Sequence, residues 1–363
     1  MSAKNSGLAS ITQLHEFDEI IDVRTPLEFA EDHLPNAINC PVLSNEERVR
    51  VGTLYKQSPF EAKKIGAILI ARNIVQHLET HWMDKPKNWH PLIYCWRGGK
   101  RSGAMTHILR QVGFAAEQLD GGYKSYRQHV RQELDALPAQ FSFRVLCGLT
   151  GSGKSRLLLA LQASGAQVLD LETLAQHRGS VLGDLPDAAQ PSQKKLDSLI
   201  WHTLNHFDRA RPVYVESESK KIGLLRVPDS LMEAMWKSPC LRLDTPDALR
   251  IGLLCEDYAH FLHDPVLLAH KLNRLRGRYA NELLNHWHAQ CQAQDWGSFI
   301  SELLAQHYDP AYLQSMRRNY PHYDQAASLI PCGLQSCDWM RLAEQCLALS
   351  GDFDNNAAHP QEA

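Results

Sequence analysis

Short apolar runs alternate with amphipathic stretches through the first part of the chain. The runs at residues 19–23 and 91–94 are apolar and bulky, which is typical of buried parallel strands. After the second run, apolar residues recur at helical spacing over residues 104–112 and stop at Gly113. This alternation predicts an α/β domain with a parallel sheet, whose ligands bind at the carboxyl ends of the strands.

A long stretch between these two strands is charged and helical in pattern. Residues 46–84 therefore look like a helical insertion between neighbouring strands of the sheet. Its apolar residues recur at a spacing that predicts one buried stripe. The residues expected in that stripe are Ile68, Ile70, Ile74, Leu78 and Trp82.

The pattern changes again after a join at residues 135–139. A strand at residues 141–148 and a helix at residues 156–163 begin a second α/β region, and from residue 245 to about residue 347 the pattern is almost wholly helical. We therefore expect two domains. They are a parallel-sheet domain at residues 1–136, and a second α/β domain at residues 140–349 with a helical C-terminal part and a disordered tail at residues 350–363.

Composition agrees with a two-domain globular protein. The 363 residues are 44% hydrophobic and 22% charged, and no apolar run is long enough for a membrane span. The first seven residues lack the apolar core of a secretory signal, and the nine cysteines are scattered, so we expect a reducing, cytoplasmic location. Cys332 and Cys337 lack a second pair at ligand spacing, so zinc is not expected. The net charge of −3 means that any nucleic-acid surface must be local.

The loop after the strand at residues 91–94 carries the first candidate chemistry. Cys95 lies at the strand end, and five residues separate it from Arg101. Backbone amides of the loop and of the next helix converge there with three cations, so the pKa of Cys95 should lie well below the free-thiol value of about 8.5. The alternative is an ordinary half-buried cysteine beside a basic turn. The candidate catalytic residues are Cys95, Arg97 and Arg101, with Trp96, Gly98, Gly99 and Lys100 around the bound anion.

Residues 148–155 predict a second anion site, because they match the pattern G-x4-G-K-S between a strand and a helix. Backbone amides would surround one phosphate, Lys154 would reach a second, and the Ser155 hydroxyl would bind Mg²⁺. The motif does not specify which polyphosphate binds, although the absence of Asn-Lys-x-Asp disfavours GTP. The candidate ligands in the loop are Thr150, Gly151, Ser152, Gly153, Lys154 and Ser155.

Acidic and basic residues follow in the second domain. Glu216 ends a strand that resembles a Walker B strand, and we expect it to act with the phosphate-binding loop. Three basic clusters with tyrosines nearby (Tyr279, Tyr320 and Tyr323) suit RNA backbone and base stacking, although a solvated helix face is the simpler explanation for any one of them. The candidate RNA-binding residues are Lys220, Lys221, Arg274, Arg276, Arg278, Arg317 and Arg318.

The first domain resembles a rhodanese domain. The resemblance rests on residues 21–24, 33–39, 119–123 and the Cys95 loop, and rhodaneses carry sulfur as a persulfide on the loop cysteine. The loop here is one residue longer than the usual sulfurtransferase form, and this spacing is found in dual-specificity phosphatases of the same fold. The longer loop favours a substrate with a phosphate on its chalcogen atom. Asp22 and Arg24 are expected to pair structurally at the base of the loop.

A rhodanese domain followed by a P-loop domain resembles the bacterial tRNA 2-selenouridine synthases, and residues 177–180, 216–221 and the insertion belong to the likeness. The resemblance implies tRNA with wobble 2-thiouridine as substrate, selenophosphate as selenium donor and S-geranylation from geranyl diphosphate as an intermediate step. It also implies that Cys95 carries selenium as S-selanylcysteine, that Arg97 and Arg101 bind the leaving phosphate, and that Lys154 and Mg²⁺ hold the prenyl diphosphate. The enzyme that makes selenophosphate is an expected partner, and a membrane is not.

Several alternatives stay open at this stage. Cys95 is also compatible with positioning the donor without a covalent intermediate, and the P-loop with binding a nucleotide. A cysteine phosphatase–kinase fusion fits the Cys-x5-Arg spacing, but the loop contains no acid to protonate a leaving alkoxide. An ATP-dependent tRNA sulfurtransferase fits both loops. A non-enzymatic docking module is disfavoured, because it would need neither a reactive thiol nor an intact P-loop.

Overall fold

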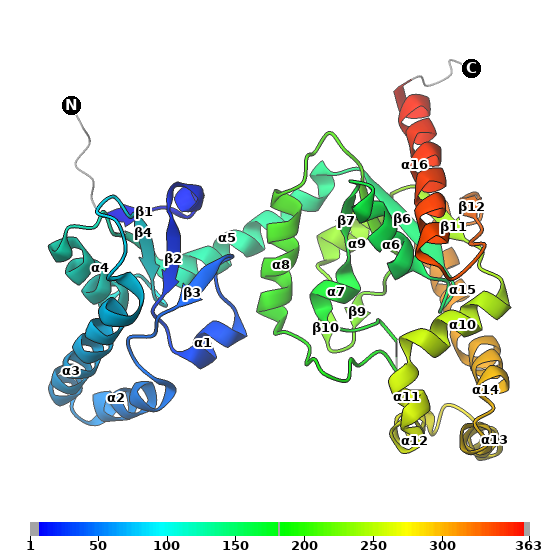
Figure 1. The fold of residues 1–363 in the computed structure, drawn as a ribbon, viewed down its shortest axis with the longest axis horizontal. Helices are drawn as coiled ribbons and strands as arrows, with labels where there is room; N and C mark the ends of the chain where they lie inside the picture. Colours follow the sequence, from blue (N-terminus) through cyan, green and yellow to red (C-terminus); the bar gives the residue numbers. More distant parts are fainter. Residues whose placement is uncertain (1–6, 181, 359–363) are drawn as a thin grey trace. The chain divides into compact units, whose positions relative to one another are not determined.

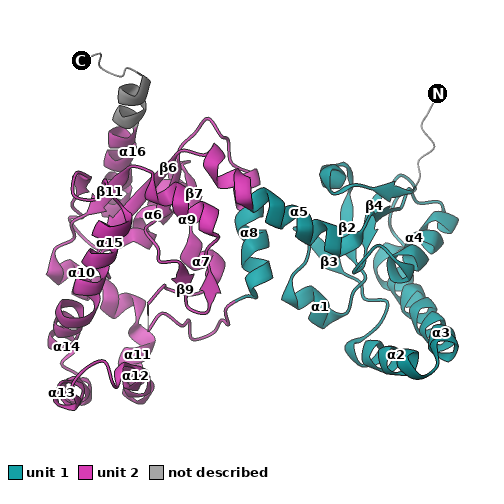
Figure 2. Ribbon diagram, turned by 180° about the vertical axis from the view of Figure 1, so that it is seen from behind, with its two compact units in different colours: residues 1–134, 191–202 teal, residues 135–190, 203–363 magenta. Residues whose placement is uncertain are grey.

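The computed structural model describes residues 7–180 and 182–358 of the chain, with side chains up to residue 350. The chain forms two compact units, shown in Figure 2. Unit 1 contains residues 1–134 and 191–202, and unit 2 contains residues 135–190 and 203–363. The predicted boundary near residue 136 is therefore close to the first crossing of the chain between the units.

Unit 1 is built on a five-stranded, fully parallel sheet with the order β1-β5-β4-β2-β3. In this order β4 has a strand on either side, so its carboxyl end lies within the sheet edge where parallel sheets bind ligands. The strands are β1 (Leu8–Ala9), β2 (Glu19–Asp22), β3 (Ala37–Asn39), β4 (Pro91–Tyr94) and β5 (Glu117–Leu119).

The helices of unit 1 begin and end at residues that are typical of helix caps. The Thr25 hydroxyl accepts from the amide of Glu28 at the start of α1, and Ser44 caps α2 in the same way. Gly113 ends α4 with a left-handed conformation (φ 110°). The helices, drawn in Figure 1, are α1 (Pro26–Glu31), α2 (Asn45–Gln57), α3 (Pro59–His77), the π-helical turn Leu78–Trp82, α4 (Lys100–Val112) and α5 (Gly122–Ala136), and a 3₁₀ turn at Ile11–Glu16 follows β1.

The predicted helical insertion is confirmed as the helices α2 and α3, but the prediction that Ile68 belongs to its buried stripe is wrong. Ile68 is 59% exposed, whereas Leu69 and Ile74 are buried. A helix turns by roughly 100° per residue, so the face that buries Leu69 and Ile74 leaves Ile68 in solvent. Trp82 and Ile74 pack in the core of unit 1, and Ile70 and Leu78 lie at its margin.

Unit 2 is built on a second parallel sheet with the order β12-β11-β6-β8-β7. The central strand β6 leads into the P-loop, and its neighbour β8 ends at Glu216. The strands are β6 (Phe143–Gly148), β7 (Gln167–Leu169), β8 (Val213–Glu216), β11 (Cys240–Leu243) and β12 (Ala327–Leu329), and a separate hairpin pairs β9 (Lys221–Ile222) with β10 (Leu225–Arg226).

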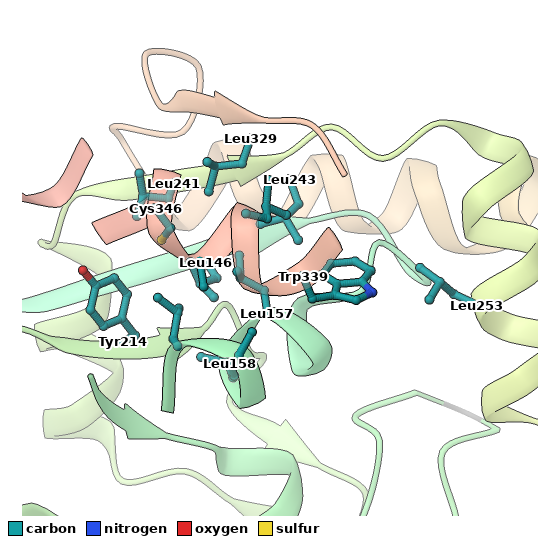
Figure 3. Packing of buried hydrophobic residues seen from close by; sticks show 14 residues of the cluster. Leu146, Leu157, Leu158, Tyr214, Leu241, Leu243, Leu253, Leu329, Trp339 and Cys346 are labelled. Carbon is teal, nitrogen blue, oxygen red and sulfur yellow. The ribbon is translucent and has the colours of Figure 1, made fainter. Parts of the chain in front are cut away.

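Helices from both ends of unit 2 complete its core. Figure 3 shows Trp339 of α16 close to Leu157 of α6, in one cluster with Leu146 and Leu243 of the sheet. No helix among the described residues is both long and apolar enough to cross a bilayer. The helices are α6 (Lys154–Ala163), α7 (Leu171–Ala175), α8 (Gln193–Asn205), α9 (Asp229–Trp236), α10 (Asp247–Asp257), α11 (Ala259–His263), α12 (Pro265–Leu272), α13 (Asn281–Gln292), α14 (Trp296–Leu303), α15 (Asp309–Asn319) and α16 (Ser336–Ala358), with shorter turns at Leu137–Gln140, Asn273–Leu275 and Leu304–Tyr308.

Two features of the predicted second domain are wrong. The start of α8 belongs to unit 1, because Ser198 donates to the buried Asp32 carboxylate (3.0 Å) and Lys194 pairs with Glu31 (2.6 Å). The predicted disordered tail is largely helical, since α16 continues to Ala358, and residues 359–363 lie outside the described residues.

The orientation of α3 gives a first testable prediction. Ile74→Ala should lower the free energy of unfolding by about 2–5 kcal/mol, because it removes a fully buried side chain. Ile68→Ala should change it by less than about 0.5 kcal/mol. Urea denaturation followed by tryptophan fluorescence measures both, since Trp82 and Trp89 share the cluster of Ile74. A large loss at Ile68 would contradict the observed orientation of the helix.

Candidate functional site

The Cys95 thiol lies directly after β4 and before the first turn of α4. Cys95 is 3% exposed, and its Sγ accepts hydrogen bonds from the Gly99 amide (3.2 Å) and the Ser102 hydroxyl (3.1 Å). Gln118 in turn donates to the Ser102 hydroxyl (2.9 Å). The sulfur therefore lies in a small set of donors supplied by the loop and the helix start, as the sequence predicts.

These donors decide the protonation of the thiol. Burial raises the pKa of Cys95, but the hydrogen bonds from Ser102 and Gly99 and the charge of Arg101 outweigh burial. The pKa of Cys95 therefore lies below the ordinary thiol value, and the predicted direction is confirmed. A thiolate is the nucleophilic form of cysteine.

The three cations of the loop differ in their surroundings. Arg97 and Lys100 are exposed, whereas Arg101 is largely buried and forms a two-point ion pair with Glu28 (Nη1–Oε2 2.7 Å, Nη2–Oε1 3.2 Å). Burial raises the pKa of Glu28, but Arg101 more than reverses this and holds that pKa below its usual value. The guanidinium that the sequence assigns to an anion thus has a carboxylate partner.

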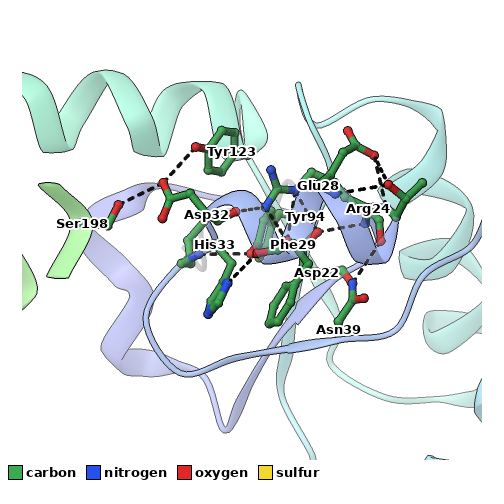
Figure 4. Close-up of polar contacts among 12 residues, drawn as sticks. Asp22, Arg24, Glu28, Phe29, Asp32, His33, Asn39, Tyr94, Tyr123 and Ser198 are labelled. Atoms are coloured by element: carbon green, nitrogen blue, oxygen red, sulfur yellow. Dashed lines mark hydrogen bonds and ion pairs between the residues drawn. The ribbon is translucent and has the colours of Figure 1, made fainter. Parts of the chain in front are cut away.

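A buried ion pair between Asp22 and Arg24 lies at the base of the Cys95 loop. Arg24 and Asp22 are both almost fully buried and bonded at two points (2.6 and 3.0 Å), as Figure 4 shows. The Arg24 guanidinium also lies 4.0 Å from the centre of the Tyr123 ring and donates to the Asp32 carbonyl. The structural role predicted for Asp22 and Arg24 agrees with this geometry.

The buried carboxylate of Asp32 lies beside this pair. Burial raises its pKa, although Tyr123 (2.8 Å) and Ser198 (3.0 Å) both donate to its Oδ2. Its Oδ1 has no hydrogen-bond partner among the described residues. Tyr123 therefore links the Arg24 pair to Asp32 and, through Trp96 at a ring distance of 5.3 Å, to the Cys95 loop.

Glycines allow the loop to touch the turn before α5. Gly98 and Gly122 both have left-handed backbones (φ 62° and 59°). A Cβ at Gly122 would lie 2.3 Å from the Cys95 carbonyl oxygen, and one at Gly98 would lie 2.8 Å from the Leu119 carbonyl oxygen. Neither position accepts a side chain without moving the loop.

The P-loop of unit 2 joins β6 to α6. Gly151 and Gly153 have left-handed backbones (φ 76° and 86°), and a Cβ at Gly153 would lie 2.2 Å from the Trp339 ring. The Lys154 ammonium group donates to the Gly148 carbonyl (2.7 Å) and lies 5.4 Å from the centre of the Tyr312 ring. Ser152 is buried, and its amide donates to the Leu149 carbonyl (3.0 Å).

Buried polar residues far along the chain hold this loop. Arg250 donates twice to the Thr150 carbonyl (3.0 and 3.1 Å) and pairs with Asp309 (2.6 Å). Thr245 donates to the Ser152 carbonyl (2.7 Å). Two carbonyls of the loop are thereby held by side chains of the protein, which fixes the loop backbone around the predicted anion site.

Three carboxylates gather beside the P-loop. Ligand atoms of Glu172, Glu216 and Glu218 all lie within 4.8 Å of one another, and the Ser155 hydroxyl donates to Glu172 (3.4 Å). Burial and neighbouring carboxylates raise the pKa of Glu172 to about 7 and that of Glu218 to about 8, and they raise that of Glu216 as well. Burial and mutual repulsion therefore disfavour ionisation of all three carboxylates together unless a cation joins them.

This arrangement fits a divalent cation of the Mg²⁺ type. Glu216 is fully buried, and its Oε2 has no hydrogen-bond partner among the described residues. Carboxylate and hydroxyl oxygens are the ligands that Mg²⁺ prefers. The candidate ligands are the predicted Ser155 hydroxyl and three glutamates, Glu172, Glu216 and Glu218.

Known families match both units. A family model described as the tRNA 2-selenouridine synthase AAA domain matches residues 141–288, and a rhodanese-like domain model matches residues 8–129. The tRNA 2-selenouridine synthase of Shewanella sediminis is 31% identical over 324 residues, which are 81% of this chain and 86% of that protein. The chain belongs to the tRNA 2-selenouridine synthase family.

Two further members of the family support this assignment. The tRNA 2-selenouridine synthase of Sulfurovum sp. (strain NBC37-1) is 33% identical over 331 residues, covering 83% of this chain and 89% of that protein. That of Nitrosomonas europaea is 38% identical over 259 residues, covering 69% and 66%. The predicted architecture, a rhodanese domain followed by a P-loop domain, is confirmed.

The segments that carry the family likeness meet at the acidic cluster. A Cβ at Gly179 would lie 3.0 Å from the Glu172 carboxylate and 3.1 Å from that of Glu218. His177 is buried, accepts from the Gly179 amide (3.1 Å) and faces Asp184 (3.4 Å). Residues 177–180 therefore form one wall of the carboxylate site.

The basic clusters have the exposed cations that the sequence predicts, but not all of the exposed tyrosines. Tyr320 and Tyr323 are buried, at 1% and 6% exposure, so the prediction that bases stack on these two rings is wrong. Their burial follows from packing under the end of α15, where apolar ring surface leaves water. The seven predicted cationic residues are all exposed, but three are already paired: Lys220 with Asp229, Arg274 with Asp184 and Arg317 with Asp324.

Sequence reasoning missed several residues that shape the sites. Glu28 was recognised only as part of a helix entry, and Arg250 had no local motif at all. A capping box gives a signal for Glu28, since Thr25 and Glu28 have the required spacing. No local signal leads to Arg250, because it acts on a loop 100 residues away.

The Cys95 donors predict a measurable change in reactivity. Ser102→Ala should raise the pH midpoint of Cys95 alkylation by iodoacetamide, because it removes a hydrogen bond that stabilises the thiolate. Peptide mass spectrometry over a pH series measures this, with the exposed Cys332 as reference in the same sample. Ser125→Ala, which alters a hydroxyl away from the sulfur, should leave the midpoint unchanged. An unchanged midpoint in Ser102→Ala would contradict the proposed cause.

The acidic cluster predicts a pH-dependent stability. A pKa raised from 4.5 to about 8 means that the folded protein keeps a proton on Glu218 that the unfolded chain has released. Without divalent metal, the thermal midpoint should therefore fall as pH rises through the window between these values, and less so in Glu218→Gln.

Added Mg²⁺ should remove much of this fall, because it replaces the protons as counter-charge. Thermal unfolding at pH 6.0 to 8.5 in EDTA or in Mg²⁺ measures both effects. Glu233→Gln on the exposed face of α9 is the matched control and should behave as the wild type. Equal pH slopes for wild type and Glu218→Gln in EDTA would contradict the prediction.

Proposed function

We propose that this protein replaces the sulfur of wobble 2-thiouridine in tRNA by selenium. In the first step the sulfur is geranylated from geranyl diphosphate, and in the second selenium from selenophosphate takes its place. The observation that carries the proposal is that one chain contains both a cysteine held by donors at a helix start and a P-loop motif beside a carboxylate cluster. Membership of the tRNA 2-selenouridine synthase family supports it.

The Cys95 loop is the proposed selenium site. The Cys95 sulfur accepts from the Gly99 amide at the start of α4, and Arg97 and Lys100 of the same loop are exposed. A phosphoryl group bound there would meet amides and cations together, which is the usual environment of a tetrahedral anion. Arg101 would join by exchanging Glu28 for the phosphoryl oxygens. Cys95 then lies beside the selenium atom and positions the donor while water attacks phosphorus. The P–Se bond breaks, phosphate leaves, and selenide keeps the electron pair for its attack on the uridine.

The P-loop is the proposed diphosphate site. Arg250 and Thr245 hold two of its carbonyls, and Lys154 need only leave the Gly148 carbonyl to reach a phosphate. The three glutamates and Ser155 would hold Mg²⁺, which when bound supplies positive charge to the diphosphate oxygens. In the geranyl transfer, the uridine sulfur forms the bond to the allylic carbon, and diphosphate leaves with the electron pair of the broken C–O bond.

The order of the two steps follows from leaving-group chemistry. A thione sulfur leaves poorly, whereas the alkylated sulfur of S-geranyl-2-thiouridine leaves as geranyl thiolate. A selenium nucleophile that adds at carbon 2 of the ring would therefore expel the geranyl thiolate together with the electron pair of the C–S bond. We place this activity in the cytoplasm, with the exposed cations of unit 2 as a tRNA contact surface.

An ATP-dependent sulfurtransferase is the second candidate. The P-loop, Lys154 and the carboxylate cluster suit a nucleoside triphosphate as well as a prenyl diphosphate. The two candidates differ in which compound each loop uses, so the products on the tRNA distinguish them.

Two single substitutions test the proposal. With 2-thiouridine tRNA, geranyl diphosphate, selenophosphate and Mg²⁺, nucleoside mass spectrometry should find S-geranyl-2-thiouridine and 2-selenouridine for the wild type. Cys95→Ala should lose 2-selenouridine at least 100-fold and accumulate the geranylated nucleoside, because only the selenium site is altered. Lys154→Ala should lose geranyl transfer by a similar factor, because the diphosphate loses its main cation.

The controls separate the two loops. Lys154→Ala should still convert tRNA that has been geranylated beforehand, and Cys332→Ala, an exposed thiol elsewhere, should match the wild type. Selenouridine formation in Cys95→Ala would remove that residue from the mechanism. ATP-dependent thiolation without geranyl diphosphate would favour the sulfurtransferase.

A further inference from the structure

An apolar groove runs along unit 1 beside the Cys95 loop. Helices α2, α3 and α4 form its walls, and its volume is about 470 Å³, within the range of small-molecule sites. Figure 1 shows these three helices next to one another. The groove is lined with aliphatic side chains and with small residues that leave space between the helices. Among them are Val51, Gly66, Ala67, Ile70, Ala104 and Ile108.

One end of the groove is shared with the Cys95 site. Lys100 and Arg101 line it, and the next residue, Ser102, donates to the Cys95 thiol (3.1 Å). From Arg101 to Ile108, the lining residues of α4 follow one face of the helix. At 1.5 Å per residue, this face is on the order of 10 Å long. The groove thus leads away from the thiolate as an apolar channel whose only charged side chains are cations, with Arg48 and Lys63 as the other two.

We propose that this groove binds the geranyl chain of S-geranylated tRNA while its uridine faces Cys95. This inference rests on the proposed function and adds a location for the chain. An extended geranyl chain spans about 9 Å, since C–C bonds near 1.5 Å advance roughly 1.3 Å each. It therefore matches the apolar face of α4 in length. The sulfur at its head would lie near Lys100 and Arg101, where the selenophosphate anion is also bound.

The chemistry of the groove favours a chain attached to the nucleoside over free geranyl diphosphate. The diphosphate has its own candidate site at the P-loop, with Lys154 and the carboxylate cluster. No carboxylate lines the groove to hold a metal for a diphosphate. A neutral alkyl chain needs only apolar walls, and it leaves the cations at the groove end to the selenium donor.

The test compares two tryptophan substitutions on α3. Ala67→Trp fills the groove, whereas Ile68→Trp adds the same ring one residue further along, at a position that is 59% exposed and outside the lining. Ala67 is itself exposed, so both variants should fold, which thermal unfolding checks. The probes are anticodon stem–loop RNAs that carry 2-thiouridine alkylated with methyl, dimethylallyl or geranyl groups.

The wild type should bind the geranyl RNA more tightly than the methyl RNA. Each buried methylene group should raise the affinity by at most about fourfold. Ala67→Trp should weaken binding of the geranyl RNA at least tenfold and leave the methyl RNA unchanged. Conversion of the geranyl RNA to selenouridine should show the same loss in kcat/KM. Ile68→Trp should follow the wild type throughout.

Three outcomes would overturn the groove as the geranyl site. The first is that binding depends on chain length equally in Ala67→Trp and in the wild type. The second is that Ile68→Trp loses as much binding of the geranyl RNA as Ala67→Trp does. The third is that Ala67→Trp loses geranyl transfer from the diphosphate but converts pre-geranylated RNA normally. The last result would place the chain of the diphosphate there instead. Failure of the wild type to convert geranylated RNA at all would count against the proposed function itself, so the two failures are distinguishable.

Discussion

The Cys95 carbonyl accepts a hydrogen bond from the Tyr123 amide (2.9 Å), and this contact holds the reactive loop against the turn before α5. Gly122 makes the approach possible, because a Cβ there would lie 2.3 Å from the same carbonyl oxygen. The P-loop has a similar constraint, since a Cβ at Gly153 would lie 2.2 Å from the Trp339 ring. In both units the backbone of an anion loop is thus fixed by close packing. Its amides are oriented before an anion arrives, so less order has to be imposed when the anion binds.

Two ion pairs in unit 1 show how burial separates structural from functional charge. Asp22 and Arg24 are fully buried, and removing one partner of such a pair typically costs about 3–5 kcal/mol. That pair must stay intact whatever binds above it. The pair between Glu28 and Arg101 is less deeply buried, at 25% and 14% exposure. A phosphoryl dianion offers the guanidinium the same two-point geometry as the Glu28 carboxylate, so it can compete for Arg101.

The motifs and the strands that precede them were predictable, because each depends on a few neighbouring residues. The Cys95 loop, the P-loop, the caps at Thr25 and Gly113 and the helical insertion all follow from local patterns. Contacts between distant residues were not predictable in this way. Ser198 joins α8 to unit 1 through Asp32, 166 residues away, and Arg250 fixes the P-loop from a helix without a motif. The exposure of Ile68 and the burial of Tyr320 depend on what packs against each helix, which a single sequence does not specify.

The helical insertion is best understood from the size of its side chains. If α2 and α3 served only to cover α4, large apolar residues would be expected where the helices face each other, because protein interiors pack at high density. Instead small residues line the groove, among them Gly66 and Ala67 of α3 and Ala104 of α4. Apolar surface that stays in water does not contribute the stabilising free energy of burial, which is about 25 cal/mol per Å². An apolar ligand in the groove, such as the proposed geranyl chain, would recover this free energy, and this would give the insertion a role beside Cys95.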